Sequence, residues 1–211
     1  MNPNPNTGLT LVQACTELRN AAGALILLHG RGGSAADILE LGRSLSTDGW
    51  ALLAPQAEGH TWYPYSFLAP REQNEPYLSS ALEQVRSAVA TALAGGVSKE
   101  KIVLAGFSQG ACLASEFVGR NPARYGALLS FTGGLIGPLG ARLTLTGDLA
   151  GTPVLLSSGD PDPHVPWERV TETAELMREL GGRVLLRRYP GRSHTVTADE
   201  LEVAREILTN V

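Results

Sequence analysis

The segment LAGFSQGACLA, from Leu104 to Ala114, decides the fold of this chain. An apolar run leads into a Gly-x-Ser-x-Gly pattern, and small residues follow at once. With 24 glycines in 211 residues, such a pattern arises by chance about 0.2 times in a chain of this composition, so its context decides its meaning. The pattern carries chemistry where a strand precedes it, a helix follows it, and an acid and then a histidine come later in the chain.

The residues on both sides of the pattern meet the first two conditions. KIVLAG, at 101–106, is a short apolar run typical of a buried strand, and ACLASEFVGRNP, at 111–122, is helical in character. A sharp turn between them forces Ser108 into a strained backbone conformation, and the flanking glycines leave room where a side chain would clash. The Ser108 hydroxyl is then exposed above the sheet, and the backbone N–H of Gln109 points the same way.

Buried strands alternate with amphipathic helices along the whole chain. The expected strands lie at 24–28, 50–55, 101–106, 126–131, 152–159 and 183–189, with an additional edge strand at 11–18. The expected helices lie at 35–46, 78–94, 111–122, 167–180 and 197–209. This order predicts a single α/β domain over residues 1–211, with a mostly parallel sheet, helices on both faces and a flexible tail at 1–8.

Composition places the chain among ordinary globular proteins. It has 43% hydrophobic and 18% charged residues, and its formal net charge of -4 without a basic run argues against nucleic acid and anionic membranes as partners. The two cysteines, Cys15 and Cys112, are too few for a disulfide framework or a metal site, which favours a reducing compartment. The stretch MNPNPNTG does not resemble a signal peptide, and no apolar run reaches the length of a membrane span. We therefore expect a cytoplasmic protein without membrane insertion.

A serine hydroxyl is a weak nucleophile and needs a neighbouring base. Two of the four histidines precede the serine, and His164 and His194 follow it. We assign the base to His194, in the loop between the last strand and the last helix. His164 lies only two residues from Asp162, and so short a loop would hardly hold a histidine–aspartate pair and also reach the serine. His164 is expected at the rim of the site, and the alternative for His194 is a solvated loop histidine.

Asp160 and Asp162 both follow the serine and precede His194, as a triad acid should. Asp160 is expected in the turn directly after the strand, where aspartates commonly bond to nearby backbone N–H groups. Asp162 lies beyond that turn between two prolines, which stiffen the loop. We therefore favour Asp162 as the acid that orients the imidazole, and we expect Asp148 to be a turn residue.

The glycine-rich segment HGRGG, at 29–33, follows a strand and offers backbone N–H groups. We expect the amides of Arg31 and Gln109 to form an oxyanion hole, in which each donor is worth about 3 kcal/mol of transition-state stabilisation. His29 is expected to brace this loop. Cys112, four residues after the serine, is expected to be a small buried residue and not a redox group.

Residues 56–77 form a long irregular stretch, and loops of this length usually carry function. Its aromatic residues are candidates for lining an acyl or aromatic pocket, and the alternative, which is slightly favoured, is that they pack the loop onto the sheet. These residues are Trp62, Tyr63, Tyr65 and Phe67.

Five motifs occur in the order in which they are found in the phospholipase/carboxylesterase family of α/β-hydrolases, which includes the acyl-protein thioesterases: LHGRGG, PQAEGHTWYP, GFSQG, GDPDPHVP and GRSH. The resemblance spans residues 24–205 and implies an α/β-hydrolase fold without a separate lid domain, metal or cofactor. It implies a nucleophile, acid and base at Ser108, Asp162 and His194, and oxyanion amides at Arg31 and Gln109. The thioesterases tend to have an apolar residue at position 31, and the stretch at 60–76 also differs, so the chain resembles the bacterial carboxylesterase branch more closely.

These observations together predict a serine carboxylesterase that acts on small-molecule esters. Short or medium acyl chains are expected, because 132–150 is the only other long loop and the resemblance implies no lid. An acyl thioesterase or lysophospholipase would use the same groups. A binding protein with an inactive hydrolase fold is a third alternative, although such folds usually lose one of the three triad residues. The sequence leaves a homodimer open.

Overall fold

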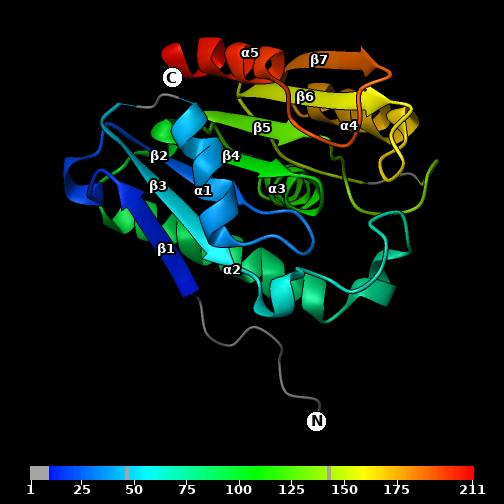
Figure 1. Ribbon diagram of the computed structural model, residues 1–211, viewed down its shortest axis with the longest axis horizontal. Helices are drawn as coiled ribbons and strands as arrows, with labels where there is room; N and C mark the ends of the chain where they lie inside the picture. Colours follow the sequence, from blue (N-terminus) through cyan, green and yellow to red (C-terminus); the bar gives the residue numbers. More distant parts are fainter. Residues whose placement is uncertain (1–9, 46–47, 142–143) are drawn as a thin grey trace.

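The structure is a computed structural model that describes residues 10–45, 48–141 and 144–211, so the tail expected at 1–8 lies outside the described residues. Its centre is a seven-stranded sheet in the order β1-β3-β2-β4-β5-β6-β7 (Figure 1). The edge strand β1 runs antiparallel to β3, and every other neighbouring pair is parallel. The strands are β1 (Thr10–Cys15), β2 (Gly23–Leu28), β3 (Trp50–Gln56), β4 (Ile102–Phe107), β5 (Ala127–Phe131), β6 (Pro153–Asp160) and β7 (Arg183–Pro190).

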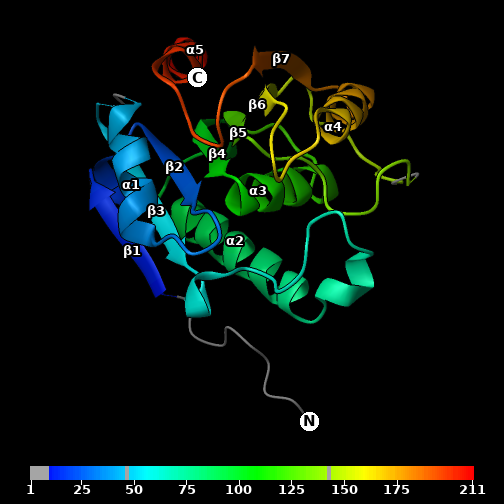
Figure 2. The same ribbon diagram turned by 45° about the vertical axis from the view of Figure 1, so that its right-hand side comes forward.

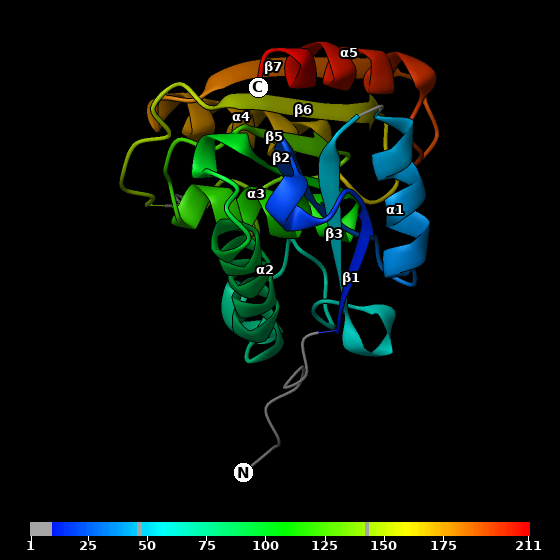
Figure 3. The same cartoon turned by 90° about the vertical axis from the view of Figure 1, so that its left-hand side faces the viewer.

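Helices cover both faces of this sheet. They are α1 (Ala35–Ser44), α2 (Tyr77–Ala94), α3 (Gln109–Arg120), α4 (Trp167–Glu179) and α5 (Ala198–Thr209), with 3₁₀ turns at Leu18–Asn20, Glu58–His60, Arg71–Asn74 and Lys99–Lys101. One apolar core joins the sheet to α1 and α5, and the other joins it to α2, α3 and α4 (Figure 3). Strand β2 serves both cores, since Leu25 faces the first and Ile26 the second. Such two-sided burial explains its uninterrupted apolar sequence.

The predicted α/β architecture and the order of its elements are confirmed. Ser34 and Thr197 are the N-caps of α1 and α5, and each forms a capping box with the acidic residue three positions on. Several bounds differ by a few residues from those predicted. Helix α3 begins at Gln109, directly after the serine, and β6 continues to Asp160 because β7 pairs with it as far as Pro190.

The parallel strands bring several loops to one edge of the sheet. The segments after β6 and β7 approach the start of α3, which follows β4 (Figure 2). Ligand sites in open parallel sheets form at this carboxyl edge. Among the described helices, none combines the length and the apolar character that a membrane crossing requires.

Candidate active site

Ser108 occupies a sharp turn between β4 and α3. Its backbone has a φ of 55° and a ψ of -119°, which a residue other than glycine holds only under constraint. The flanking glycines explain how the turn closes: a Cβ on Gly106 would overlap the carbonyl of Gly110, and a Cβ on Gly110 would overlap the carbonyl of Leu28. The turn therefore presents the Ser108 hydroxyl at the carboxyl edge of the sheet, as the pattern indicated.

Three side chains from separate loops meet at this edge. Ser108 follows β4, Asp162 follows β6 and His194 follows β7. The His194 Nε2 lies 2.9 Å from the Ser108 Oγ, and the His194 Nδ1 lies 2.9 Å from the Asp162 Oδ2. The structure thus joins in one hydrogen-bonded chain the serine, histidine and aspartate that the sequence singled out.

The Asp162 carboxylate is held in a fixed position. Its side chain is fully buried, and Oδ1 accepts hydrogen bonds of 2.9 Å from the backbone N–H groups of His164 and Val165. Burial by itself would raise the pKa of this carboxyl, but those N–H groups and the His194 imidazole together hold the pKa below its ordinary value. Asp162 is therefore ionised near neutral pH and can stabilise a positively charged imidazole.

The loop that carries His194 is anchored by Arg192, which the sequence analysis missed. The Arg192 side chain is 6% exposed, and its Nη2 donates a 2.7 Å hydrogen bond to the Thr132 hydroxyl. Its Nε lies 3.7 Å from the carboxylate of Glu200, which is fully buried in α5. These contacts tie the loop to the end of β5 and the start of α5. The sequence signal for this role is only its position, two residues before His194.

Two other aspartates that the sequence analysis considered, Asp160 and Asp148, make structural contacts outside the hydrogen-bonded chain. Asp160 was expected in a turn, but it is the last residue of β6, where it pairs with Pro190, and its carboxylate forms an ion pair with Arg188. The expectation is wrong because β7 extends the pairing of β6 past the point where its apolar residues end. Asp148 is the turn residue that the sequence predicted, since its Oδ1 accepts a 2.6 Å hydrogen bond from the backbone N–H of Ala150.

Two backbone N–H groups near Ser108 are candidates for binding an oxyanion. Gln109 is the first residue of α3, so its N–H lies at the positive end of the helix. A Cβ on Gly30 would come within 3.4 Å of the Ser108 Cβ, so the loop that carries Arg31 packs directly against the turn. Within residues 10–45, 48–141 and 144–211, the N–H groups of Arg31 and Gln109 have no hydrogen-bond acceptor. Both can therefore donate to an oxygen bound beside Ser108.

His29 braces the glycine-rich loop. Its Nδ1 donates a 2.8 Å hydrogen bond to the Gly30 carbonyl, and its Nε2 accepts a 3.1 Å hydrogen bond from the backbone N–H of Ala57. Burial lowers the pKa of His29, which keeps the ring neutral, and the two hydrogen bonds select a single tautomer. The ring thus links the end of β2 to the segment that follows β3.

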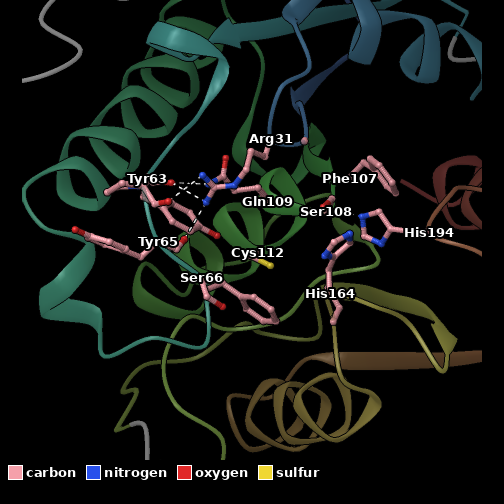
Figure 4. A pocket seen from close by; sticks show the side chains of 14 residues that line it. Arg31, Tyr63, Tyr65, Ser66, Phe107, Ser108, Gln109, Cys112, His164 and His194 are labelled. Atoms are coloured by element: carbon pink, nitrogen blue, oxygen red, sulfur yellow. Dashed lines mark hydrogen bonds between the residues drawn. The ribbon is translucent and has the colours of Figure 1, made fainter.

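A cavity of about 470 Å³ opens beside Ser108 (Figure 4). Three of the four aromatic residues expected to line a pocket do line it, namely Tyr63, Tyr65 and Phe67. His164 lines it as well, and its ring meets the His194 ring edge-on at 4.9 Å between centroids. Phe107 and Val165 also belong to the lining, although the sequence analysis did not select them. Their sequence signal is adjacency to the serine motif and to the aspartate loop.

Trp62 does not line this cavity, and the expectation that it does is wrong. Its side chain is completely buried, and its indole N–H donates a 2.8 Å hydrogen bond to the carbonyl of His29. Its ring also packs 4.8 Å from the His29 ring. Trp62 therefore fastens the 61–65 segment to the glycine-rich loop, which was the alternative considered for these aromatics.

Two buried side chains, Cys112 and Tyr63, lie in the cavity wall. Cys112 is on α3, about one helical turn after Ser108. Burial raises the pKa of the Cys112 thiol to about 12, so the thiol stays protonated at neutral pH. The Tyr63 hydroxyl is buried beside it, and burial likewise raises the pKa of this phenol. Among the described residues, this hydroxyl meets no partner stronger than the weakly hydrogen-bonding thiol. Cys112 is thus a small buried residue under the turn, as expected.

A second hollow of about 410 Å³ adjoins the first. The two share Gly30, Arg31, Phe107 and His194, which form the partition between them. The outer wall of the second hollow is largely apolar and includes Ile38, Leu41 and Val196. Among the three hydrogen-bonded residues Ser108, His194 and Asp162, only His194 borders both hollows, and Ser108 borders the first.

No three histidine, cysteine or acidic side chains in the described part of the chain gather closely enough to hold a metal ion.

The sheet topology, the strained serine turn and the hydrogen-bonded Ser108–His194–Asp162 chain define an α/β-hydrolase. The family model described as Phospholipase/Carboxylesterase matches residues 13–211, and the chain belongs to this family. A crystal structure of a phospholipase/carboxylesterase from Dyadobacter fermentans is 43% identical and superposes with a TM-score of 0.92, covering 96% of this chain and 97% of that one.

Two curated relatives match over shorter regions. A probable carboxylesterase SOBER1-like of Arabidopsis thaliana is 29% identical over 132 residues, which is 62% of this chain and 50% of the relative. Acyl-protein thioesterase 1 of Gibberella zeae is 35% identical over 123 residues, which is 54% of this chain and 49% of the relative. The chain thus spans about half the length of these curated relatives.

Proposed function

We propose that the protein is a serine carboxylesterase that hydrolyses small-molecule esters with short- to medium-length acyl chains. The observation that carries this proposal is the hydrogen-bonded chain from Asp162 through His194 to Ser108, at the edge of an open cavity. In the proposed roles Ser108 is the nucleophile, His194 the general base and acid, and Asp162 the orienting acid. Membership of the Phospholipase/Carboxylesterase family supports the same class of reaction.

The first half-reaction transfers the acyl group to the enzyme. The Ser108 Oγ attacks the ester carbonyl carbon while the His194 Nε2 accepts the hydroxyl proton. The carbonyl oxygen gains the displaced electron pair, and the N–H groups of Arg31 and Gln109 stabilise this oxyanion. The carbonyl then re-forms, the bond to the leaving oxygen breaks, and the imidazolium gives its proton to that oxygen. An alcohol departs and an acyl-enzyme remains.

The second half-reaction repeats these steps with water. The His194 Nε2 accepts a proton from a water molecule as the water oxygen attacks the acyl carbon. The same two N–H groups stabilise the second oxyanion, and the imidazolium returns its proton to the Ser108 Oγ as the acid leaves. Asp162 stabilises the imidazolium in both halves through its 2.9 Å bond to Nδ1.

We assign the two hollows to the two parts of the ester. The acyl group stays bonded to Ser108 in the intermediate, so it requires the hollow that Ser108 borders, which is the one with Tyr63 and Phe67 in its wall. The leaving group must reach His194, which borders both hollows, so the second hollow suits it. The apolar wall with Ile38 and Leu41 favours an apolar or aromatic alcohol.

A thioester substrate is the second candidate, because one curated relative is an acyl-protein thioesterase and the same groups would act. The discriminating experiment measures kcat/KM for p-nitrophenyl esters of two to sixteen carbons, for acyl-CoA thioesters of the same chains and for a lysophospholipid. The proposal expects the highest values for esters of short or medium chains. Higher values for palmitoyl thioesters would favour the thioesterase, and no turnover of any substrate would favour an inactive binding protein.

A further inference from the structure

The side chain of Arg31 contacts a part of the chain remote from it in sequence. Residues 61–65, which we call the bridge segment, include Tyr63 and Tyr65 in the wall of the cavity beside Ser108 (Figure 4). The Arg31 Nη1 donates a 3.0 Å hydrogen bond to the carbonyl of Pro64. Its Nη2 donates to the carbonyls of Tyr63 and Tyr65, at 2.9 Å each. One guanidinium therefore binds three consecutive carbonyls of the bridge segment.

The side chain of Gln109 binds the same segment. Its Oε1 accepts hydrogen bonds from the Trp62 N–H at 3.0 Å and from the Thr61 hydroxyl at 3.3 Å. Its Nε2 donates a 2.8 Å hydrogen bond to the Tyr63 carbonyl. That carbonyl thus accepts from Arg31 and from Gln109, the two residues whose backbone N–H groups are the proposed oxyanion donors.

The two donors differ in how firmly their own backbone is held. The N–H of Gln109 is fixed because it begins α3. The N–H of Arg31 lies in a loop with three glycines, one of which, Gly32, has a φ of 77°. Glycine leaves the backbone many conformations, so such a loop does not fix a donor by itself. A further hydrogen bond holds this loop from the 3₁₀ turn at Glu58–His60, where the His60 carbonyl accepts from the Gly32 N–H at 2.7 Å.

We propose that the side chains of Arg31 and Gln109 are positioning residues: by binding the same bridge segment, they tie the loop that carries the Arg31 N–H to the start of α3 and so set the separation of that N–H from the fixed Gln109 N–H. This inference rests on the proposed function, because it presumes that those N–H groups stabilise an oxyanion. Such positioning stabilises the transition state and does not change the binding of substrate in the ground state. Its loss lowers kcat and leaves KM nearly unchanged.

The first test removes the Arg31 side chain and keeps its backbone N–H. In Arg31→Met we expect kcat for p-nitrophenyl butyrate to fall by about tenfold to a hundredfold, because a small misplacement of a catalytic group has effects of this size. KM should change by less than about twofold. Arg31→Lys restores the charge but not the forked geometry, so it should recover little of the lost kcat. Arg205→Met is the matched control, since its guanidinium also binds a backbone carbonyl, that of Ser44.

The second test measures the geometry of the oxyanion site directly. A boronic acid forms a tetrahedral adduct on a serine nucleophile and needs the oxyanion donors, whereas a substrate-like ketone of the same chain binds in the ground state. Arg31→Met should weaken boronate inhibition by about the same factor as kcat and leave inhibition by the ketone within about twofold. A purely structural role for Arg31 would weaken both inhibitors or neither.

The third test addresses the contacts of the Gln109 side chain with the bridge segment. Gln109→Glu keeps the oxygen that accepts from Trp62 and Thr61 and loses the donor to Tyr63, whereas Gln109→Met loses both. We expect kcat to fall in both variants, and the neutral Gln109→Met measures the loss of the contacts without adding a charge near the oxyanion; thermal unfolding checks that each variant folds. Combined with Arg31→Met, the effect of Gln109→Met should be less than multiplicative, because both act through the Tyr63 carbonyl.

Three outcomes would overturn the inference. One is an unchanged kcat in Arg31→Met, with or without a raised KM, because the Arg31 side chain would then only line the cavity. Another is an equal fall of kcat in Arg205→Met, and a third is multiplicative behaviour of the combined variant. The failure of the proposed function has a different signature, in which the wild-type protein turns over none of the esters. If a Gln109 variant does not fold, Arg31→Met decides alone, because its exposed side chain can be lost without burying a polar group.

Discussion

The Asp162 carboxylate bonds the His194 imidazole at 2.9 Å, whereas the Asp160 carboxylate, only two residues earlier, pairs with Arg188 on the neighbouring strand. The difference arises where β6 ends. Asp160 is still part of the strand pairing, and Asp162 lies in the loop beyond it, where two backbone N–H groups fix its other oxygen. Two aspartates of the same motif thus have separate tasks, which gives a matched pair of variants.

Asp162→Asn should lower kcat by up to about 10⁴-fold with the fold intact, because the amide can no longer stabilise the imidazolium. Asp160→Asn removes an ion pair between partly exposed groups, which is worth at most about 1 kcal/mol of unfolding free energy, and should keep its turnover. Steady-state kinetics and urea unfolding of both variants check this. A dead Asp160→Asn beside an active Asp162→Asn would reverse the assignment.

The lowered pKa of Asp162 also predicts how stability depends on pH. A carboxyl whose pKa is lower in the folded than in the unfolded protein contributes stability that is complete above the unfolded value. That contribution disappears as the pH falls below about 4 and through the folded pKa. The difference in urea midpoint between wild type and Asp162→Asn should therefore stay constant from pH 7 to pH 5 and shrink in more acidic buffer. A difference that persists unchanged at pH 3 would contradict the lowered pKa.

Ser108→Ala should abolish ester turnover and leave the thermal unfolding temperature nearly unchanged, because a small side chain replaces another in the same turn. A fluorophosphonate probe should label the wild-type protein on Ser108 and leave the variant unlabelled, as read by mass spectrometry of the peptide. Modification of a different serine, or substantial turnover by the variant, would remove Ser108 from the role of nucleophile.

Much of the fold could be predicted from the sequence because the five inner strands, β2 to β6, are buried on both faces. Runs such as ALILL at 24–28 have no polar residue, and their alternation with helical spacing leaves little choice but a parallel sheet. The positions of Ser108, Asp162 and His194 followed from the order of motifs at strand ends. Local sequence was enough where the deciding contacts were local or imposed by the sheet.

The remaining features depend on contacts that no local pattern records. Trp62 and Tyr63 are adjacent aromatics, yet only Tyr63 lines the cavity, and this depends on the path of the loop relative to His29. The end of β6 depends on how far β7 extends beside it. Arg31 binds carbonyls more than thirty residues away, so its side chain gave no signal although its backbone was correctly placed in the glycine-rich loop.

The two cysteines should respond very differently to alkylation. With a pKa of about 12, fewer than about one in 10⁴ Cys112 thiols is ionised at pH 7.5, and the side chain is buried, whereas Cys15 is exposed. Iodoacetamide should therefore modify Cys15 alone in the native protein and leave ester turnover unaffected. Both cysteines should react in urea, which serves as the control. Rapid native modification of Cys112 with loss of activity would show that the thiol is accessible.

The last prediction compares two buried tyrosines by thermal unfolding. The Tyr63 hydroxyl is buried with only the Cys112 thiol beside it, whereas the buried Tyr125 donates a 2.9 Å hydrogen bond to the Asn121 carbonyl. A poorly paired buried hydroxyl costs free energy, and removing it relieves that cost; removing a well-paired one leaves a carbonyl without its donor. Tyr63→Phe should therefore be as stable as wild type or more stable, and Tyr125→Phe less stable by about 1 kcal/mol. A Tyr63→Phe protein destabilised as much as Tyr125→Phe would mean that its hydroxyl has a strong partner in the folded protein.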